Sequence, residues 1–333
     1  MNNIFILVGL YFFINLILLQ NYQRLAKKIN LYDKPDNKLK KHIKKVPILG
    51  GIILLINFLI ILPVSILIFD FLIFDKKREI FSLFFLIISF FLIGFFDDKI
   101  KMSSNMRIFL GIFVLLISIS LNNDLLIQIL QFSFYEKRIY LENISYIFTI
   151  FAFLAFIHAI NMFDGLNAQV LLYFIIINTF LFIISSFNIF YLSLYFPLIS
   201  ILILNYNSRV FLGDGGSYLL AALYAYLIIY EFNITKNISF SDHILILMII
   251  PGLELLRLSF IRLINGKNIF DGDLNHIHHI LKKNHGLFNT NVIVLSLVLT
   301  PILLLYANIN SFIIIFLTIL SYFILIFYNK KFK

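Results

Sequence analysis

Residues 80–101 read IFSLFFLIISFFLIGFFDDKIK, and this stretch decides the fold. It is almost wholly apolar up to Phe96, and two aspartates and two lysines then follow in residues 97–101. A helix that spans a lipid bilayer needs about 20 predominantly apolar residues. We therefore predict a membrane-spanning helix near residues 80–96 that ends in a charged cluster.

The whole chain shares the composition of this stretch. Of its 333 residues, 61% are apolar and 13% are charged, whereas a soluble globular chain is about 45–50% apolar and about 25% charged. Phe accounts for 40 residues, and neither Cys nor Trp occurs. Lipid must therefore be the solvent for most of the chain, which excludes a soluble enzyme, a disulfide-stabilised secreted scaffold and a disordered tail.

Apolar runs recur along the sequence and predict an all-α polytopic membrane protein with about ten or eleven transmembrane helices. They lie near residues 4–22, 48–69, 80–96, 107–121, 144–163, 168–187, 189–206, 217–232, 244–263, 290–307 and 311–328. Residues 125–143 alternate roughly between apolar and polar side chains and carry charged residues at their centre. This pattern favours a small β-hairpin outside the membrane, on the periplasmic side. No internal repeat or long linker is visible, so residues 1–333 are interpreted as a single integral membrane domain.

Lysines and arginines gather in one set of predicted loops and are scarce in the other. The richer set comprises segments near residues 24–45, 99–107, 257–267, 282–283 and 330–333 with Arg209, and the poorer set holds Lys76, Lys77, Arg78, Lys137, Arg138 and Lys236. By the positive-inside rule the richer set is cytoplasmic, the N-terminus is outside and the C-terminus is inside. The net charge of +10 then reflects topology and contact with anionic lipid, and no nucleic-acid partner is expected.

Two polar clusters at predicted helix ends carry carboxylates. GFFDDKIK (residues 94–101) contains two adjacent aspartates, which suit a divalent metal or a base that faces a phosphate. The alternative is a solvated helix end. NMFDGLN (residues 161–167) places Asn161, Asp164 and Asn167 on one face if it is helical, and the alternative is an ordinary helix C-cap.

Three further clusters fall on the same predicted face. NYNSRVFLGDGGS (residues 205–217) surrounds Asp214 with glycines at the start of a helix, where free N–H groups bind an anion and Asp214 can hold Mg²⁺; a flexible turn is the alternative. DGDLNHIHH (residues 271–279) places histidines among cations, which suits a phosphate better than zinc; an exposed loop is the alternative. Residues 33–51 contain DKP, KKH and VPILGG in a basic segment beside the membrane. Together the five clusters predict metal-assisted phosphoryl transfer with a lipid as one substrate.

Taken in order from Asp33 to His279, these clusters resemble the motifs of the polyprenyl-phosphate N-acetylhexosamine-1-phosphate transferase family, or glycosyltransferase family 4. The resemblance implies that a sugar-1-phosphate passes from a UDP-sugar to undecaprenyl phosphate with release of UMP. It implies the initiating step of a cell-envelope polysaccharide such as O-antigen or another lipopolysaccharide glycan. The implied partners are undecaprenyl phosphate, a GlcNAc-type UDP-N-acetylhexosamine and membrane lipids, and the implied cofactor is Mg²⁺, with Mn²⁺ as a substitute. A bacterial inner membrane with a cytoplasmic active site is expected, and a homodimer is left open.

The family's motifs also imply roles for individual residues. The implied catalytic residues are Asp97, Asp98, Asp164 and His279, and the implied Mg²⁺ ligand is Asp214. Phe211 is the implied aromatic that stacks on uracil. The other implied substrate-binding residues are Lys101, Asn161, Asn167, Asn205, Gly213, Arg262, His276 and His278.

Two positions depart from the family pattern. Asn167 and Ala168 stand where many members have Asp-Gly, so a carboxylate near the nucleotide is missing. Glu254 stands where an Asp is common, and its charge is retained. These departures bear on the choice of sugar, which no motif in this sequence specifies.

Three other functions stay open as alternatives. The related phospho-N-acetylmuramoyl-pentapeptide transferases of peptidoglycan synthesis carry an HHH-Phe-Glu pattern, which HIHH at residues 276–279 does not match. A CDP-alcohol phosphotransferase would carry a compact DG…AR…G…D…D motif, which is absent. A membrane transporter would place charges or broken helices near the middle of the membrane, whereas these clusters lie at predicted helix ends.

Overall fold

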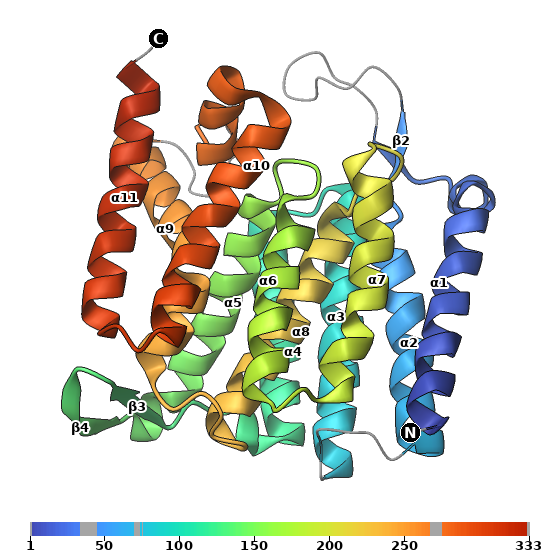
Figure 1. The fold of residues 1–333 in the computed structure, drawn as a ribbon, viewed down its shortest axis with the longest axis horizontal. Helices are drawn as coiled ribbons and strands as arrows, with labels where there is room; N and C mark the ends of the chain where they lie inside the picture. The colour runs from blue at the N-terminus through green and yellow to red at the C-terminus, as the bar shows by residue number, and fades with distance from the viewer. Residues whose placement is uncertain (1, 34–44, 70–73, 75, 267–274, 332–333) are drawn as a thin grey trace. The chain divides into compact units, whose positions relative to one another are not determined.

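The computed structural model describes residues 2–33, 45–69, 74, 76–266 and 275–331 (Figure 1). Within these ranges it contains eleven α-helices and two small antiparallel strand pairs, which confirms the predicted all-α polytopic membrane fold. Part of two predicted clusters lies outside the described residues, namely Lys34, Pro35, Lys40, Lys41, His42, Lys44, Asp271, Gly272, Asp273 and Leu274.

The helices follow the predicted apolar runs closely. They are α1 (Asn2–Ile29), α2 (Gly50–Phe69), α3 (Lys77–Ile100), α4 (Ser104–Leu121), α5 (Ser145–Phe163), α6 (Gln169–Ile184), α7 (Ile189–Tyr206), α8 (Gly213–Asn233), α9 (Ser241–Ile264), α10 (Ile277–Tyr306) and α11 (Ser311–Lys331). The strands are β1 (Tyr32–Asp33), β2 (Val46–Pro47), β3 (Ile129–Phe132) and β4 (Tyr135–Tyr140).

The surface of these helices is that of a protein in lipid. Among the described residues, eight helices are long and apolar enough to cross a membrane. Large apolar side chains lie exposed along them, such as Phe109 and Phe113 on α4 and Phe316 and Phe327 on α11. Contiguous exposed apolar surface of this kind is stable in hydrocarbon and unfavourable in water. The chain is therefore a multi-pass membrane protein.

The first part of α10 differs from the prediction. The apolar run begins near residue 290, but the helix begins at Ile277. Its first turns carry His and Lys side chains, and hydropathy alone does not detect a polar helical segment. Gly286 interrupts this helix with a φ of 74°, in the left-handed region that glycine adopts without a steric penalty.

The chain divides into two compact units. Unit 1 comprises residues 1–122 and 174–224, and unit 2 comprises residues 123–173 and 225–333. The expectation of one membrane domain over residues 1–333 stays a prediction.

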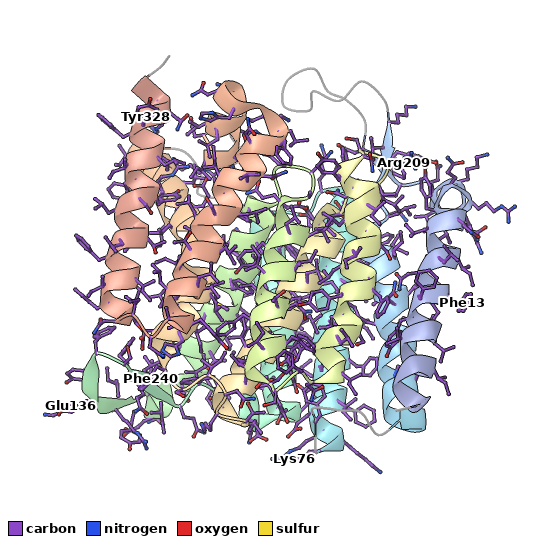
Figure 2. The ribbon with its side chains drawn as sticks, viewed as in Figure 1. Phe13, Lys76, Glu136, Arg209, Phe240 and Tyr328 are labelled. Atoms are coloured by element: carbon purple, nitrogen blue, oxygen red, sulfur yellow. The ribbon has the colours of Figure 1, made fainter. Side chains whose placement is uncertain are left out.

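Polar side chains join apolar helices of unit 1 in two places. Asn15 on α1 donates through Nδ2 to Asn57 Oδ1 on α2 at 2.9 Å, and both side chains are buried. Ser82 on α3 donates to the backbone oxygen of Ser118 on α4 at 3.0 Å. Figure 2 shows Arg209 and Lys76 at opposite ends of the helices of unit 1, in keeping with their predicted placement on opposite sides of the membrane.

Unit 2 contains the predicted hairpin. Strands β3 and β4 pair antiparallel around Ser133 and Phe134, and every residue of β4 is exposed. The hairpin is fixed to the start of α9, because the Asp242 carboxylate accepts the Ser133 N–H at 2.8 Å and the Ser133 hydroxyl at 2.6 Å. The sequence correctly predicted this hairpin, and its location on the periplasmic side stays a prediction.

Candidate active site

The predicted site residues are divided between the two units. Unit 1 holds Asp97, Asp98, Lys101, Asn205, Phe211, Gly213 and Asp214. Unit 2 holds Asn161, Asp164, Asn167, Arg262, His276, His278 and His279.

In unit 1, three helix ends meet at glycines. The backbone of α2 approaches that of α8 so closely that a Cβ on Gly51 would lie 2.5 Å from the amide nitrogen of Gly216. A Cβ on Gly94 of α3 would lie 2.6 Å from the amide nitrogen of Gly215. Any larger residue would therefore force these helices apart. The VPILGG, GFFDDKIK and VFLGDGGS motifs thus form one packed junction.

A short backbone pairing adds to this junction. Phe211 donates its N–H to the carbonyl of Pro47 at 3.0 Å, and its own carbonyl accepts the N–H of Gly50 at 3.0 Å. Phe211 is therefore fixed in the segment that enters α8, with its ring half-buried.

Asp98 binds the start of α8. One carboxylate oxygen accepts the N–H of Asp214 at 3.1 Å, and the other accepts the N–H of Gly215 at 3.1 Å. Gly213 precedes them with a φ of 75°, and a Cβ there would lie 2.7 Å from Asp98 Oδ2. The sequence predicted that amides at this glycine-rich turn would bind an anion, and for these two amides the anion is the side chain of Asp98. A carboxylate at a helix N-terminus is stabilised by both the hydrogen bonds and the helix dipole.

Asp97 pairs with a residue that the sequence analysis missed. Its Oδ2 accepts Arg107 Nη1 at 2.6 Å, and its Oδ1 accepts the N–H of Met102 at 2.8 Å. The alternative of a solvated helix end is wrong for Asp97, which is only 7% exposed. The Arg107 guanidinium thus places a cation beside the Asp97 carboxylate. A local feature of the sequence could have identified Arg107. The link between α3 and α4 is short, which makes the two helices antiparallel neighbours and brings Asp97 and Arg107 together.

Two other predicted residues of unit 1 have local structural settings. Asn205 is buried and donates through Nδ2 to the carbonyl of Val210 at 3.0 Å, which closes the turn between α7 and α8. Lys101 caps the C-terminus of α3 with a φ of 52°, and its side chain is exposed.

In unit 2, the NMFDGLN motif is not a continuous helix. Helix α5 ends at Phe163, Asp164 is its C-cap with a ψ of 57°, and Asn167 lies in the turn that follows. The expected single face of Asn161, Asp164 and Asn167 therefore does not form, and the helix C-cap interpretation is correct. Gly165 lies in the turn after α5, and a Cβ on Gly165 would overlap the ring of His278.

The histidine motif is packed against this same turn. Asn291 on α10 donates through Nδ2 to the carbonyl of Asn167 at 3.0 Å. His278 lies against Gly165 and is 1% exposed, and His276, the N-cap of α10, is 8% exposed. The alternative of an exposed histidine loop is therefore wrong for these two residues.

The histidine rings contact one another. Those of His276 and His278 stack with centroids 5.0 Å apart, and those of His278 and His279 lie 4.5 Å apart at 66°. In the part of the chain that the structure describes, neither ring nitrogen of His278 has a hydrogen-bond partner. Arg262 is also buried. The two nitrogen atoms of His278 that lack a partner among the described residues are therefore buried beside the turn at Gly165.

The donor set bears on the predicted metal. Over the described residues, no group of three or more His, Cys, Asp or Glu side chains is arranged to hold an ion. Asp97 and Asp98 already accept hydrogen bonds from Arg107 and from α8. Mg²⁺ commonly takes only one or two protein carboxylates together with substrate phosphates. The described residues therefore form no cage of protein ligands, and the binding of a substrate-bound Mg²⁺ by Asp214 stays a prediction.

By its fold and by these clusters, the chain is a multi-pass membrane protein whose polar motifs lie at the ends of its helices. The family model described as Glycosyl transferase family 4 matches residues 80–232. The chain is similar to the undecaprenyl-phosphate alpha-N-acetylglucosaminyl 1-phosphate transferase of Thermotoga maritima, at 26% identity over 81% of this chain and 79% of that protein.

Two further relatives agree with this. The probable undecaprenyl-phosphate N-acetylglucosaminyl 1-phosphate transferase of Bacillus subtilis is 28% identical over 80% of this chain and 74% of that protein. The undecaprenyl-phosphate alpha-N-acetylglucosaminyl 1-phosphate transferase of Escherichia coli K12 is 26% identical over 83% of this chain and 76% of that protein. These similarities confirm the resemblance to the family that the motifs predicted.

Proposed function

We propose that the chain is an enzyme that transfers an N-acetylhexosamine-1-phosphate, of the GlcNAc type, from a UDP-sugar to undecaprenyl phosphate and releases UMP. The observation that carries the proposal is the junction in unit 1, where Asp98 holds the glycine-rich start of α8 and Asp97 holds Arg107. The names of the relatives support the transfer of N-acetylglucosamine-1-phosphate to undecaprenyl phosphate.

The reaction is a displacement at phosphorus. An oxygen of the lipid phosphate attacks the β-phosphorus of the UDP-sugar, and the bond from that phosphorus to the bridging oxygen of UMP breaks. A lipid phosphate is anionic near neutral pH, so no strong base is needed. Catalysis of phosphoryl transfer then consists of positioning and charge stabilisation.

The arrangement of Asp97 and Asp98 supports direct attack. Both carboxylates accept hydrogen bonds from protein groups, so we assign them to positioning Arg107 and the start of α8. Arg107 is the group of this cluster that would stabilise negative charge on a phosphate. We assign Lys101 to phosphate, Phe211 to uracil, and Asn205 and Gly213 to shaping the turn that carries Phe211.

Asp214 would hold Mg²⁺, or Mn²⁺ in its place. When bound, the ion would neutralise diphosphate charge and so ease the departure of UMP. In unit 2, we assign His276, His278, His279 and Arg262 to phosphate, and Asn161, Asp164 and Asn167 to the nucleotide side.

The predicted topology supports the cellular setting. The richer set of Lys and Arg loops includes the segments that carry these motifs, so we place the site on the cytoplasmic face of a bacterial inner membrane. We propose that the product begins a cell-envelope polysaccharide.

Nucleotide release by the purified, detergent-solubilised protein tests the proposal. Undecaprenyl phosphate, Mg²⁺ and a panel of UDP-sugars are supplied, and UMP is separated from UDP. UMP that appears only with the lipid supports sugar-1-phosphate transfer, whereas UDP would show ordinary glycosyl transfer and contradict the proposal.

A single variant tests the metal assignment. Asp214→Asn removes the carboxylate charge that would bind Mg²⁺, so we expect it to abolish Mg²⁺-dependent UMP release while the circular dichroism spectrum stays unchanged. Glu136→Gln, on the exposed hairpin, is the control and should retain full activity. Unaltered activity of Asp214→Asn would remove Asp214 from the metal site.

A further inference from the structure

A buried polar network lies beside the histidine cluster of unit 2. Its centre is Glu254 on α9, whose side chain is fully buried. The Glu254 carboxylate accepts Arg257 Nη2 at 2.9 Å, the backbone N–H of Ile277 at 2.9 Å and the hydroxyl of Tyr322. A buried carboxylate with this many charge-assisted partners is held in one position.

Arg257 closes the network. Its Nε donates to the hydroxyl oxygen of Tyr322 at 2.9 Å, and its Nη2 donates to the carbonyl of Asn275 at 2.7 Å. Glu254 and Arg257 therefore contact the backbone on both sides of His276, where the chain enters α10, and Tyr322 bonds to both of these side chains.

The contact with Ile277 acts as a helix cap. The first N–H groups of a helix have no partner inside it, and a capping side chain normally accepts one of them. His276 is the N-cap of α10, but its side chain makes no capping hydrogen bond. Glu254 supplies that acceptor from another helix, and its negative charge is favourable at the positive end of the helix dipole.

This cap fixes the histidine pair. His276 Nδ1 lies 3.5 Å from Glu254 Oε1, and the His276 ring stacks on that of His278. Among the described residues, Arg257 Nη1 and both ring nitrogens of His278 have no hydrogen-bond partner. The network thus holds in place nitrogen atoms that no described residue satisfies.

We propose that Glu254, Arg257 and Tyr322 form a positioning network that sets the start of α10 and thereby fixes the stacked rings of His276 and His278. The role of the histidines rests on the proposed function, and the network rests on the contacts above. Tyr322 lies on the last helix, beyond the residues that the family model matches.

Tyr322→Phe and Glu254→Gln test the proposal, with Tyr306→Phe as the matched control because Tyr306 is 66% exposed on α10. Two quantities are measured in the purified full-length protein: amide hydrogen exchange along α10, and kcat and KM for UMP release. We expect faster exchange at residues 276–280 and unchanged exchange beyond Gly286 in both test variants. We expect kcat to fall by about 10- to 100-fold, as when residues that orient histidine ligands are removed, with a smaller change in KM. Glu254→Asp keeps the charge and should recover part of kcat.

The outcomes separate this proposal from the proposed function. Unchanged exchange at residues 276–280 in both variants, or an unchanged kcat, overturns the positioning role. Faster local exchange in a protein whose unmodified form releases no UMP would retain the network and overturn the proposed function. If Glu254→Gln fails to fold, Tyr322→Phe carries the test, because it removes one hydroxyl and keeps the buried ring.

Discussion

At the scale of single residues, Asp97 and Asp98 are neighbours in the chain with different partners. Asp98 binds two backbone amides of α8, and Asp97 binds a guanidinium on α4. One carboxylate therefore joins two helix ends and the other fixes a cation. This division gives each aspartate a separate set of testable consequences.

Replacing Asp98 should lower stability in steps. Asp98→Ala leaves the N–H groups of Asp214 and Gly215 without an acceptor, and each buried unsatisfied group costs about 1–3 kcal/mol. Asp98→Asn keeps one acceptor oxygen and should lose less. Thermal unfolding in detergent, followed by far-ultraviolet circular dichroism because the chain has no Trp, measures both. Equal midpoints for the two variants would contradict the capping role.

The Asp97–Arg107 pair should show energetic coupling. Asp97 is 7% and Arg107 17% exposed, and removal of one partner of a largely buried pair leaves the other charge uncompensated. In a double-mutant cycle of Asp97→Asn and Arg107→Gln, we expect a coupling free energy of about 1–3 kcal/mol. Additive effects on the unfolding free energy would show that the contact is unimportant, and Arg138→Gln on the exposed hairpin should change nothing.

Patterns in the sequence predicted which residues are functional candidates, but they did not predict which of these residues contact one another. Asp98 and Asp214 were both identified as functional candidates, but they are separated by 116 positions, so no local pattern could show that one binds the backbone of the other. Ala168 adopts a φ of 72°, in the left-handed region that alanine seldom occupies. The Gly expected here from the family pattern was the signal for this conformation, and it was interpreted only as a change near the nucleotide.

At the scale of elements, the junction of α2, α3 and α8 depends on glycines, which have no side chain to keep the helix backbones apart. Gly51 and Gly94 let the helix backbones approach within van der Waals contact. Close packing of this kind is a common way for helices to associate in lipid, where apolar burial drives little.

Two glycine-to-alanine variants should therefore differ in sign. Gly94→Ala forces a Cβ into the backbone of Asp214 and Gly215 and should destabilise by about 1–3 kcal/mol. Gly252→Ala, on α9 with nothing within 4 Å of the added atom, should be neutral or stabilise by up to about 1 kcal/mol. Thermal unfolding of both variants tests this, and a stable, fully active Gly94→Ala would contradict the described junction.

The helices could be predicted because lipid demands long apolar runs, and each run near 80–96, 107–121 and 311–328 became a helix. The start of α10 could not, because its cap comes from Glu254 on another helix. The hairpin was predicted from its charged centre, but its attachment through Asp242 depends on a contact 109 positions away.

At the scale of the whole molecule, a multi-pass membrane fold carries the polar motifs of the proposed phosphoryl transfer at its helix ends. Composition alone predicted that lipid surrounds most of the chain. The motifs predicted the resemblance to the family, and the relatives confirm that resemblance. Asn167 departs from the family pattern on the nucleotide side, where the departure bears on the choice of sugar.

The most direct test follows the β-phosphorus of the donor. The purified protein receives UDP-GlcNAc labelled at that phosphorus, undecaprenyl phosphate and Mg²⁺, and the lipid and aqueous phases are separated. Transfer of the sugar-1-phosphate predicts that the label enters the lipid phase in proportion to the UMP released. Label that stays in aqueous UDP while the sugar alone moves to the lipid would contradict it.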